Sequence, residues 1–105
     1  MLYCKTMPKD ELKQRIHAAM ERAPHRDRVR RVSLFGSYLY GAQTVDSDID
    51  LLVEFAQPIG YFGLTELQQY LEQTMGHHID LVTPDALSKY FRDGVLRDAE
   101  RVYER

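Results

Sequence analysis

Hydrophobic residues recur along this chain at two different spacings, and the longer spacing predicts its helices. Segments of about 8–23 and 64–75 each repeat apolar side chains every three or four positions, which is the spacing of a helix with one buried face. Pro24 discourages continuation of the first segment, and Gly76 stands where a helix C-cap glycine belongs after the second. Both segments are therefore expected to be amphipathic helices.

The C-terminal quarter continues the helical spacing. Thr83-Pro84 supplies an N-cap followed by a proline at the first helical position. Leu87, Tyr90 and Phe91 then continue on one face, and Gly94 is expected to interrupt the helix. A last helical stripe is expected to run to the C-terminus through Val95, Ala99, Val102 and Tyr103.

The shorter spacing predicts three strands, at 31–35, 49–55 and 78–82, because apolar and β-branched residues alternate or run together there between turn residues. Gly36 ends the first strand, and a short helical turn is expected from Ser37. Counting that turn, the order of elements is α-β-α-β-α-β-α. This order predicts an α/β (α+β) fold in which helices flank a small mixed three-stranded sheet.

Length and composition narrow the class of protein. A chain of 105 residues has room for one hydrophobic core, so residues 1–105 are expected to form a single domain. With 44% apolar and 29% charged residues, it falls among ordinary globular domains. No apolar stretch is long enough to span a bilayer, and early charges argue against a secretory leader, so a cytoplasmic protein without membrane contact is expected. Cys4 is the single cysteine, which argues against an internal disulfide and against zinc.

The charges are unevenly distributed, although the net charge is only −2. Residues 1–31 hold nine Lys or Arg against four Asp or Glu, while residues 32–105 hold five against twelve. A basic first third is typical of a surface that attracts nucleic acid or an acidic partner, and also of a solvated helix face followed by a loop. The acidic remainder holds the candidate chemistry.

Three aspartates stand on predicted strands among apolar neighbours. In Asp48-Ile49-Asp50 the two carboxylates project to the same side, about 7 Å apart by the rise of the strand, while Ile49 enters the core. Asp80 stands in the same way on the next strand and joins them if the two strands are adjacent. Carboxylates brought together repel unless a cation neutralises them, and hard oxygen ligands suit Mg²⁺ or Mn²⁺. A divalent metal site is one interpretation of this pattern, and solvent-facing strand residues are the other.

Gly36-Ser37 favours the first interpretation, because the pair follows a strand and is separated from Asp48 by ten residues. Glycine permits close backbone approach, and backbone N–H groups at a helix start attract phosphate together with a serine hydroxyl. Alone, a Gly-Ser pair usually marks only a turn. At this distance from an Asp-x-Asp pair, it indicates a site for nucleotide phosphates.

The combined motif resembles the signature of the DNA polymerase β-like nucleotidyltransferase superfamily. Residues 34–41 and 46–55 look like the minimal branch of that superfamily, and so do residues 79–87, at the distance where the branch carries its third acid. The resemblance spans residues 32–104. It implies the nucleotidyltransferase fold and a similarity to the MNT antitoxins of bacterial and archaeal HEPN/MNT toxin–antitoxin pairs.

The resemblance also implies a role for each motif residue. Asp48 and Asp50 would each bind Mg²⁺, with two ions expected and Mn²⁺ as the alternative, and Asp80 would complete the catalytic metal site and help to deprotonate the acceptor. Gly36 and Ser37 would hold the triphosphate of ATP. The implied reaction transfers AMP to a tyrosine hydroxyl of a partner HEPN ribonuclease and releases pyrophosphate. A hetero-oligomer with that toxin is therefore expected.

One position departs from the family pattern. Members often continue Gly-Ser with an arginine, whereas Tyr38 follows here, which removes a cation that meets phosphates. Two alternatives stand beside the adenylyltransferase: a catalytically weak module of the same fold that neutralises its partner by binding alone, and a nucleotidyltransferase that acts on RNA or a small molecule. Because the chain shows no separate nucleic-acid or acceptor domain, nucleic acid is not expected as the direct substrate.

Overall fold

The described part of the chain comprises residues 8–36 and 48–104 of a computed structural model. Its elements follow the chain in the order α1 (Lys9–Met20), η1 (Arg26–Arg28), β1 (Val29–Phe35), β2 (Ile49–Phe55), α3 (Gly60–Met75), β3 (Ile79–Val82), η2 (Pro84–Ala86), α4 (Lys89–Asp98) and β4 (Glu100–Glu104), where η marks a short 3-10 helix. The fold class expected from the sequence is confirmed, since helices pack against a small mixed sheet. No helix within these residues is long and apolar enough to cross a membrane.

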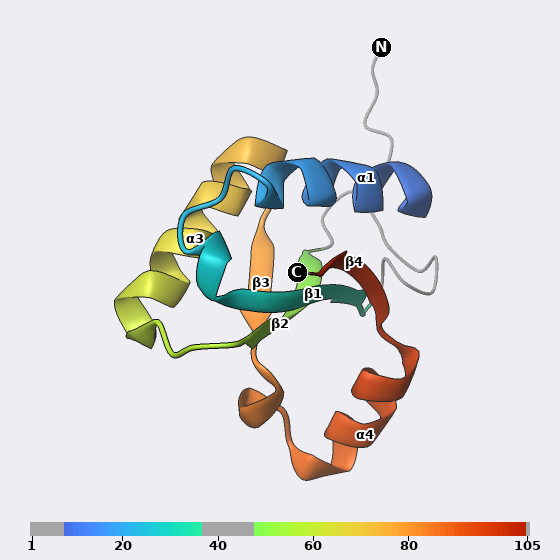
Figure 1. Cartoon of the computed structure of the whole chain (residues 1–105). Helices are drawn as coiled ribbons and strands as arrows, with labels where there is room; N and C mark the ends of the chain where they lie inside the picture. Colours follow the sequence, from blue (N-terminus) through green and yellow to red (C-terminus); the bar gives the residue numbers. More distant parts are fainter. Residues whose placement is uncertain (1–7, 37–47, 105) are drawn as a thin grey trace.

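The sheet has four strands in the order β3-β2-β1-β4. β1 runs antiparallel to both of its neighbours, whereas β2 and β3 are parallel and are connected through α3. Figure 1 shows α1 and α3 on one side of this sheet, and η2 with α4 on the other. The two faces therefore differ, because one packs into the core and the other carries polar side chains of the strands.

The core lies between α1, α3 and one face of the sheet. Alternate residues of β2 and one stripe from each helix point into it. Its fully buried residues include Leu12, Ile16, Ile49, Leu51, Val53, Leu67 and Leu71. At the edge of this core the Tyr70 hydroxyl donates to the Ala19 carbonyl oxygen at 2.7 Å and ties α3 to α1. Gly76 follows α3 in the left-handed conformation (φ 69°), so the predicted C-cap glycine is confirmed.

The C-terminal segment is a strand, and the helix that the spacing predicts there is wrong. α4 ends at Asp98, Ala99 is extended, and β4 then pairs with β1. The edge of β1 explains the difference, because its backbone N–H and C=O groups need partners, and Val102 and Tyr103 are residue types that suit a strand. The expected three-stranded sheet therefore has a fourth strand, and the expected order of elements gains a final β after its last α.

The helix expected from Thr83-Pro84 also differs in the structure. Pro84–Ala86 form only the turn η2, and α4 begins later, at Lys89. Gly94 does not interrupt α4, because a glycine keeps its backbone N–H and weakens a helix by about 1 kcal/mol without breaking it. The helical turn expected from Ser37 lies outside the described residues.

Candidate active site

Two of the three candidate aspartates lie side by side in the sheet. Asp50 of β2 and Asp80 of β3 are direct partners in the parallel register, which places their backbones about 5 Å apart. Both stand on the face opposite the core, because their strand neighbours Ile49 and Ile79 are buried in it. Asp48 precedes β2 by one residue and is exposed. The pairing of β2 with β3 thus brings together carboxylates that are distant in the sequence.

This arrangement changes the pKa of the Asp50 carboxyl. Its side chain is half-buried, and burial together with the negative charges of Asp80 and Asp48 raises its pKa to about 6. Both of these neighbours are exposed to solvent. A nearby cation would favour the ionised form of such a carboxyl, so the site is one that attracts positive charge.

Gly36, which follows β1, makes room for the Asp50 side chain. Its backbone is left-handed (φ 81°), a conformation that residues with a side chain rarely adopt. A Cβ placed on this residue would lie 2.1 Å from Oδ2 of Asp50 and 2.9 Å from its Cγ. Gly36 therefore lets the backbone lie close to the Asp50 carboxylate. Contact of the same residue with phosphate remains a prediction. Ser37, the other predicted phosphate-binding residue, lies outside the described residues.

The donor atoms of the three aspartates fit a hard divalent cation. Carboxylate oxygens are the ligands that Mg²⁺ and Mn²⁺ prefer, and a bound cation would relieve the repulsion that raises the Asp50 pKa. Within residues 8–36 and 48–104, no three His, Cys, Asp or Glu side chains lie close enough to hold a metal ion as they stand. Asp48 and Asp80 are exposed, and exposed side chains change rotamer readily. Cation binding by all three carboxylates would therefore need their side chains to rotate.

A hollow beside Gly36 brings in residues that the sequence motifs do not point to. It has a volume of about 320 Å³ and lies between the end of β1 and α4, with Phe35 and Gly36 on one side and Tyr90, Phe91 and Val95 on the other. The helical spacing places Tyr90 and Phe91 on one apolar face, and the structure exposes that face, with exposed fractions of 86% and 66%. Spacing alone does not tell a core face from an exposed apolar face, so no signal in the sequence finds this hollow.

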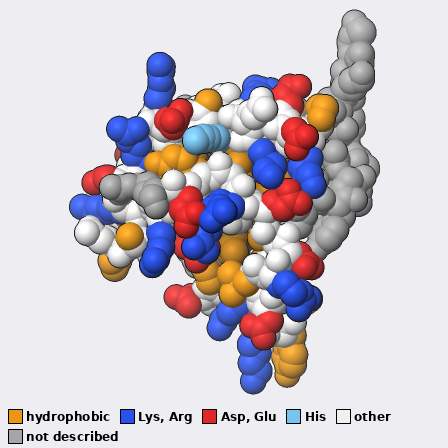
Figure 2. Space-filling view, turned by 45° about the vertical axis from the view of Figure 1, so that its right-hand side comes forward, with side chains coloured by type: hydrophobic (Ala, Val, Ile, Leu, Met, Phe, Trp, Pro, Cys, Tyr) orange, Lys and Arg blue, Asp and Glu red, His pale blue; other side chains and the backbone are white. Residues whose placement is uncertain are grey.

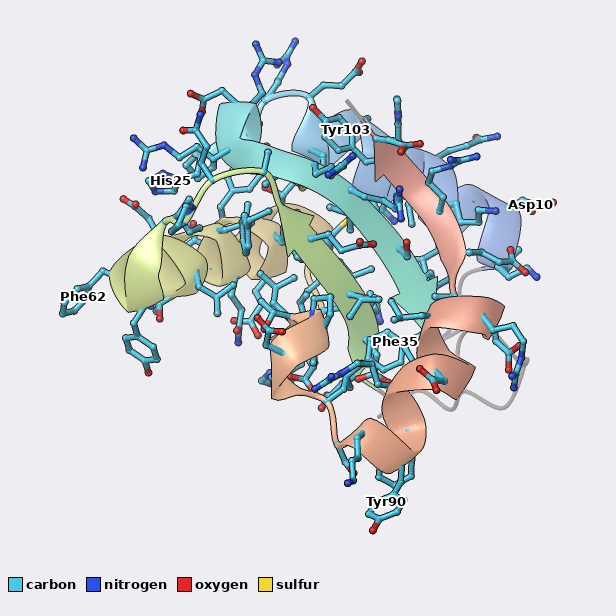
Figure 3. The ribbon with its side chains drawn as sticks, turned by 60° about the horizontal axis from the view of Figure 1, so that its bottom comes forward. Asp10, His25, Phe35, Phe62, Tyr90 and Tyr103 are labelled. Carbon is cyan, nitrogen blue, oxygen red and sulfur yellow. The ribbon has the colours of Figure 1, made fainter. Side chains whose placement is uncertain are left out.

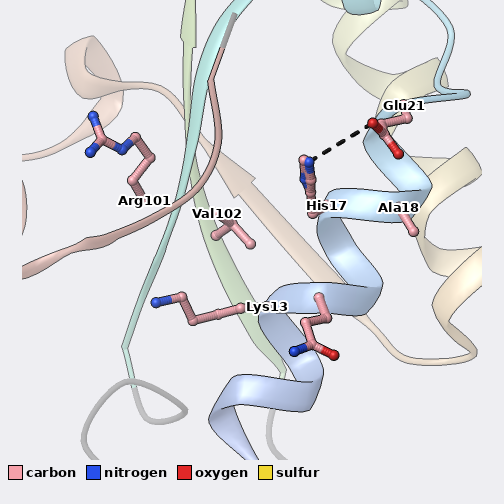
Figure 4. A pocket seen from close by; sticks show the side chains of 7 residues that line it. Lys13, His17, Ala18, Glu21, Arg101 and Val102 are labelled. Atoms are coloured by element: carbon pink, nitrogen blue, oxygen red, sulfur yellow. Dashed lines mark ion pairs between the residues drawn. The ribbon is translucent and has the colours of Figure 1, made fainter.

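A second hollow lies on the other side of the sheet. Figure 4 shows it between α1 and β4, where it has a volume of about 410 Å³. Its lining includes Lys13, His17, Ala18, Glu21, Arg101 and Val102. His17 and Glu21 form an ion pair across one helical turn at 3.9 Å. Since α1 covers the face of the sheet opposite Asp50, this hollow is separate from the three carboxylates.

Comparison with known proteins places the sequence among nucleotide-transferring enzymes. The profile of the family described as "Nucleotidyltransferase domain" matches residues 12–102. The protein adenylyltransferase MntA of Thermococcus cleftensis is 34% identical over 89 residues, which cover 85% of this chain and 90% of that protein. The residues matched by the family profile include Gly36 and all three candidate aspartates, so that match concerns the site as well as the core.

Solved structures share the fold. A protein described as a candidate minimal nucleotidyltransferase superposes with a TM-score of 0.75 at 33% identity, and the match covers 90% of this chain and 96% of that one. A toxin–antitoxin complex with AMP-PNP contains a chain that superposes with a TM-score of 0.71 at 26% identity, covering 89% of this chain and 73% of that one. The strands and helices of this chain are thus arranged as in the nucleotidyltransferase fold.

Proposed function

The chain belongs to the nucleotidyltransferase domain family, and on this premise we propose that it is an antitoxin that transfers AMP from ATP to a tyrosine hydroxyl of a HEPN-domain toxin. The observation that carries the proposal is the in-register pair of Asp50 and Asp80 beside Gly36. Nucleotidyl transfer needs negative oxygen ligands where a triphosphate and a hydroxyl meet. The pair supplies them at one end of the sheet.

The relatives support the choice of nucleotide and of partner. The Thermococcus cleftensis protein is named as a protein adenylyltransferase. The complex with AMP-PNP is one of a toxin with its antitoxin. The HEPN class of the toxin, and tyrosine as its acceptor residue, rest on the resemblance of the motifs at 34–55 and 79–87. Because the reaction consumes ATP, we place the protein in the cytoplasm.

In the proposed reaction the aspartates bind a cation and accept a proton. Asp48, Asp50 and Asp80 would hold Mg²⁺, with two ions proposed and Mn²⁺ as the alternative. Bound there, Mg²⁺ neutralises charge on the triphosphate and lowers the pKa of the acceptor hydroxyl. Asp80 is exposed beside Asp50, so it is accessible to a hydroxyl that arrives from solvent. We therefore assign Asp80 the role of proton acceptor.

The bond changes are those of an in-line displacement. The tyrosine oxygen forms a bond to the α-phosphorus of ATP while the bond from that phosphorus to the pyrophosphate oxygen breaks. The hydroxyl proton passes to Asp80, and pyrophosphate leaves. Gly36 and Ser37 would hold the triphosphate through backbone N–H groups and a hydroxyl. The AMP left on the tyrosine is bulky and anionic, so beside a ribonuclease site it would repel RNA and neutralise the toxin.

The experiment combines the protein with Mg²⁺, ATP and the HEPN-domain protein encoded beside it, and measures the intact mass of both chains. We expect the HEPN chain to gain AMP units, and EDTA to abolish the gain. Asp48→Asn and Asp50→Asn are each expected to slow transfer at least about 100-fold. Asp10→Asn, an exposed residue on α1, which covers the face of the sheet opposite Asp50 (Figure 1), is the matched control and is expected to transfer AMP normally.

The outcomes separate the alternatives. Full transfer by Asp48→Asn or by Asp50→Asn would sink the assignment. A tight complex whose two masses stay unchanged would indicate a module that neutralises its toxin by contact alone. In a second reaction with α-labelled ATP and an added RNA or small-molecule acceptor, label on that acceptor would keep the nucleotidyltransferase and change its acceptor.

A further inference from the structure

α4 presents apolar side chains to solvent on the side of the sheet that carries the aspartates. Tyr90, Phe91 and Leu96 have exposed fractions of 86%, 66% and 43%, and no side chain of this helix is buried. Figure 2 shows hydrophobic side chains projecting at the lower end of the molecule, where α4 lies. Tyr90 and Phe91 are adjacent in the first turn of α4, and large apolar groups exposed together in this way are typical of an interaction surface.

The first turn of α4 is held in place although it buries little. Ser88 caps the helix, since its Oγ accepts from the Tyr90 N–H at 3.2 Å. The Arg92 guanidinium donates to the carbonyl oxygens of Pro84 and Leu87 at 3.0 and 3.1 Å, which fastens the helix to η2 and the turn after it. A surface that is ordered before its partner arrives loses little entropy on binding.

The exposed surface is continuous with the candidate active site. The hollow of about 320 Å³ runs from Phe35 and Gly36 to Tyr90 and Phe91, and Gly36 is the residue against which the Asp50 carboxylate lies. Figure 3 shows Phe35 near α4, and Tyr90 at the far end of that helix pointing away from the sheet. A protein whose side chain enters this hollow therefore lies over α4 and comes close to Gly36.

We propose that Tyr90 and Phe91 form the dock for the acceptor protein and direct its tyrosine to Asp50 and Asp80. This inference rests on the proposed function and adds to it the surface of this chain that selects the partner. The acceptor is a protein with two features, a projecting tyrosine and an apolar patch beside it. The patch covers the aromatic pair on α4 while the tyrosine enters the hollow.

The direction of the aromatic side chains favours a protein over the base of ATP as their occupant. The Tyr90 side chain points away from the sheet (Figure 3) and most of its surface is exposed, so it is available to a large partner that extends beyond the hollow. Lys89 already places its Nζ 5.9 Å from the centre of the Tyr90 ring, which is the distance of a cation–π contact. Each aromatic side chain offers about 150–250 Å² of surface for burial, and the pair together offers an area that a protein surface can cover and a single base cannot.

The chain contains a matched control for this proposal, because α3 begins with a second exposed pair of the same residue types. Tyr61 and Phe62 have exposed fractions of 77% and 87%, and Figure 3 shows Phe62 on the opposite side of the view from Phe35 and Tyr90. The two double variants to compare are Tyr90→Ser with Phe91→Ser, and Tyr61→Ser with Phe62→Ser. Each removes the same atoms from an exposed helical turn, and thermal unfolding of both verifies that they fold.

Three quantities are measured for the wild type and both double variants: the Kd for the HEPN-domain protein encoded beside this chain, by calorimetry; AMP transfer to that protein, by mass; and the Kd for ATP with Mg²⁺. The α4 variant is expected to weaken partner binding at least about 30-fold, which is the effect of losing an aromatic hot spot. Its transfer should fall through KM for the partner, and its Kd for ATP should stay within about twofold of the wild-type value. The α3 variant is expected to match the wild type in all three.

Several results would overturn the dock. These are unchanged partner binding in the α4 variant, equal weakening by both double variants, and weaker ATP binding with normal partner binding, which would assign the aromatic pair to the nucleotide. Wild-type protein that binds the partner and transfers no AMP would contradict the proposed function alone, and the binding comparison would still decide the dock. Absence of wild-type binding would overturn both.

Discussion

Replacement of Asp50 by asparagine should stabilise the protein while it removes the proposed activity. Burial and the charges of Asp80 and Asp48 raise the pKa of Asp50 from 3.8 to about 6. Because each tenfold change in proton affinity corresponds to about 1.4 kcal/mol, ionisation of this carboxyl costs the folded state about 3 kcal/mol before screening. The side chain is only half-buried and water screens part of the effect, so we expect Asp50→Asn to gain about 1–2 kcal/mol.

The pH dependence of this gain has a definite sign. Above about pH 6, Asp50 is ionised in both the folded and the unfolded protein, and the folded protein carries the whole cost. Below pH 3.8, the carboxyl is protonated in both states and the cost is absent. The stability gained by Asp50→Asn is therefore largest at neutral pH and fades as the pH falls from about 6 to about 4.

Urea unfolding of the wild type and of Asp50→Asn at pH 8 and pH 4, in EDTA, measures this difference. In thermal unfolding of the same proteins, this gain in stability at pH 8 corresponds to an increase in Tm of about 5–10 °C for a chain of this size. Asp93→Asn, on the exposed surface of α4, is the matched control and should stay within about 0.5 kcal/mol of the wild type. Mg²⁺ should stabilise the wild type more than Asp50→Asn, because a ligand that binds only the folded state raises its stability.

Two results would refute this reasoning. One is an Asp50→Asn protein that is less stable than the wild type at pH 8. The other is a difference in stability of the same size at pH 8 and pH 4, because it would show that the effect does not come from ionisation of this carboxyl.

Three further substitutions test other contacts. Gly36→Ala forces a left-handed alanine whose methyl group meets the Asp50 carboxylate, so we expect stability to fall by at least about 1 kcal/mol and AMP transfer to fall more than tenfold; normal transfer would contradict the importance of this contact. Glu100 accepts hydrogen bonds from two lysines of α1, which lower its pKa. Glu100→Gln should therefore cost up to about 1 kcal/mol at pH 7 and less at pH 3 in urea unfolding, because the contribution of an acid with a lowered pKa is lost as the pH falls. Tyr70→Phe removes the hydrogen bond to the Ala19 carbonyl oxygen and should cost about 1 kcal/mol in the same assay, with AMP transfer unchanged.

Much of the acid site is predictable from the sequence because it depends on local patterns. The strand predicted at 49–55 has the same bounds in the structure, and the alternation of side chains places Asp50 opposite the core as expected. The position of Asp80 beside Asp50 is not predictable from local patterns, because strand order depends on which edges and connections pack together. The pattern predicts the two carboxylates separately, and only the fold shows that they are partners.

The C-terminal segment shows where local patterns fail. Val102 and Tyr103 fit a helical stripe and a short strand equally well, so their spacing does not decide between the two. The backbone N–H and C=O groups along the free edge of β1 need partners. β4, from a distant part of the sequence, supplies them, and this pairing makes the segment a strand. The same limit applies to Tyr90 and Phe91, because a helix face that lacks a neighbour has the same spacing as one that is buried.

The position of β4 also explains why α4 lies beside the aspartates. β3 and β4 occupy opposite edges of the sheet, so the chain must cross the whole sheet between Val82 and Glu100. α1 and α3 already cover one face, which leaves the face with Asp50 and Asp80 for the crossing (Figure 1). Glu100 pairs with Leu34, close to Gly36, so the crossing ends where the carboxylates lie. The position of α4 next to Asp50 and Asp80 is therefore a consequence of strand order. A change that detached β4 from β1 would misplace the dock on α4, whereas the pairing of β2 with β3 would still keep the two aspartates together.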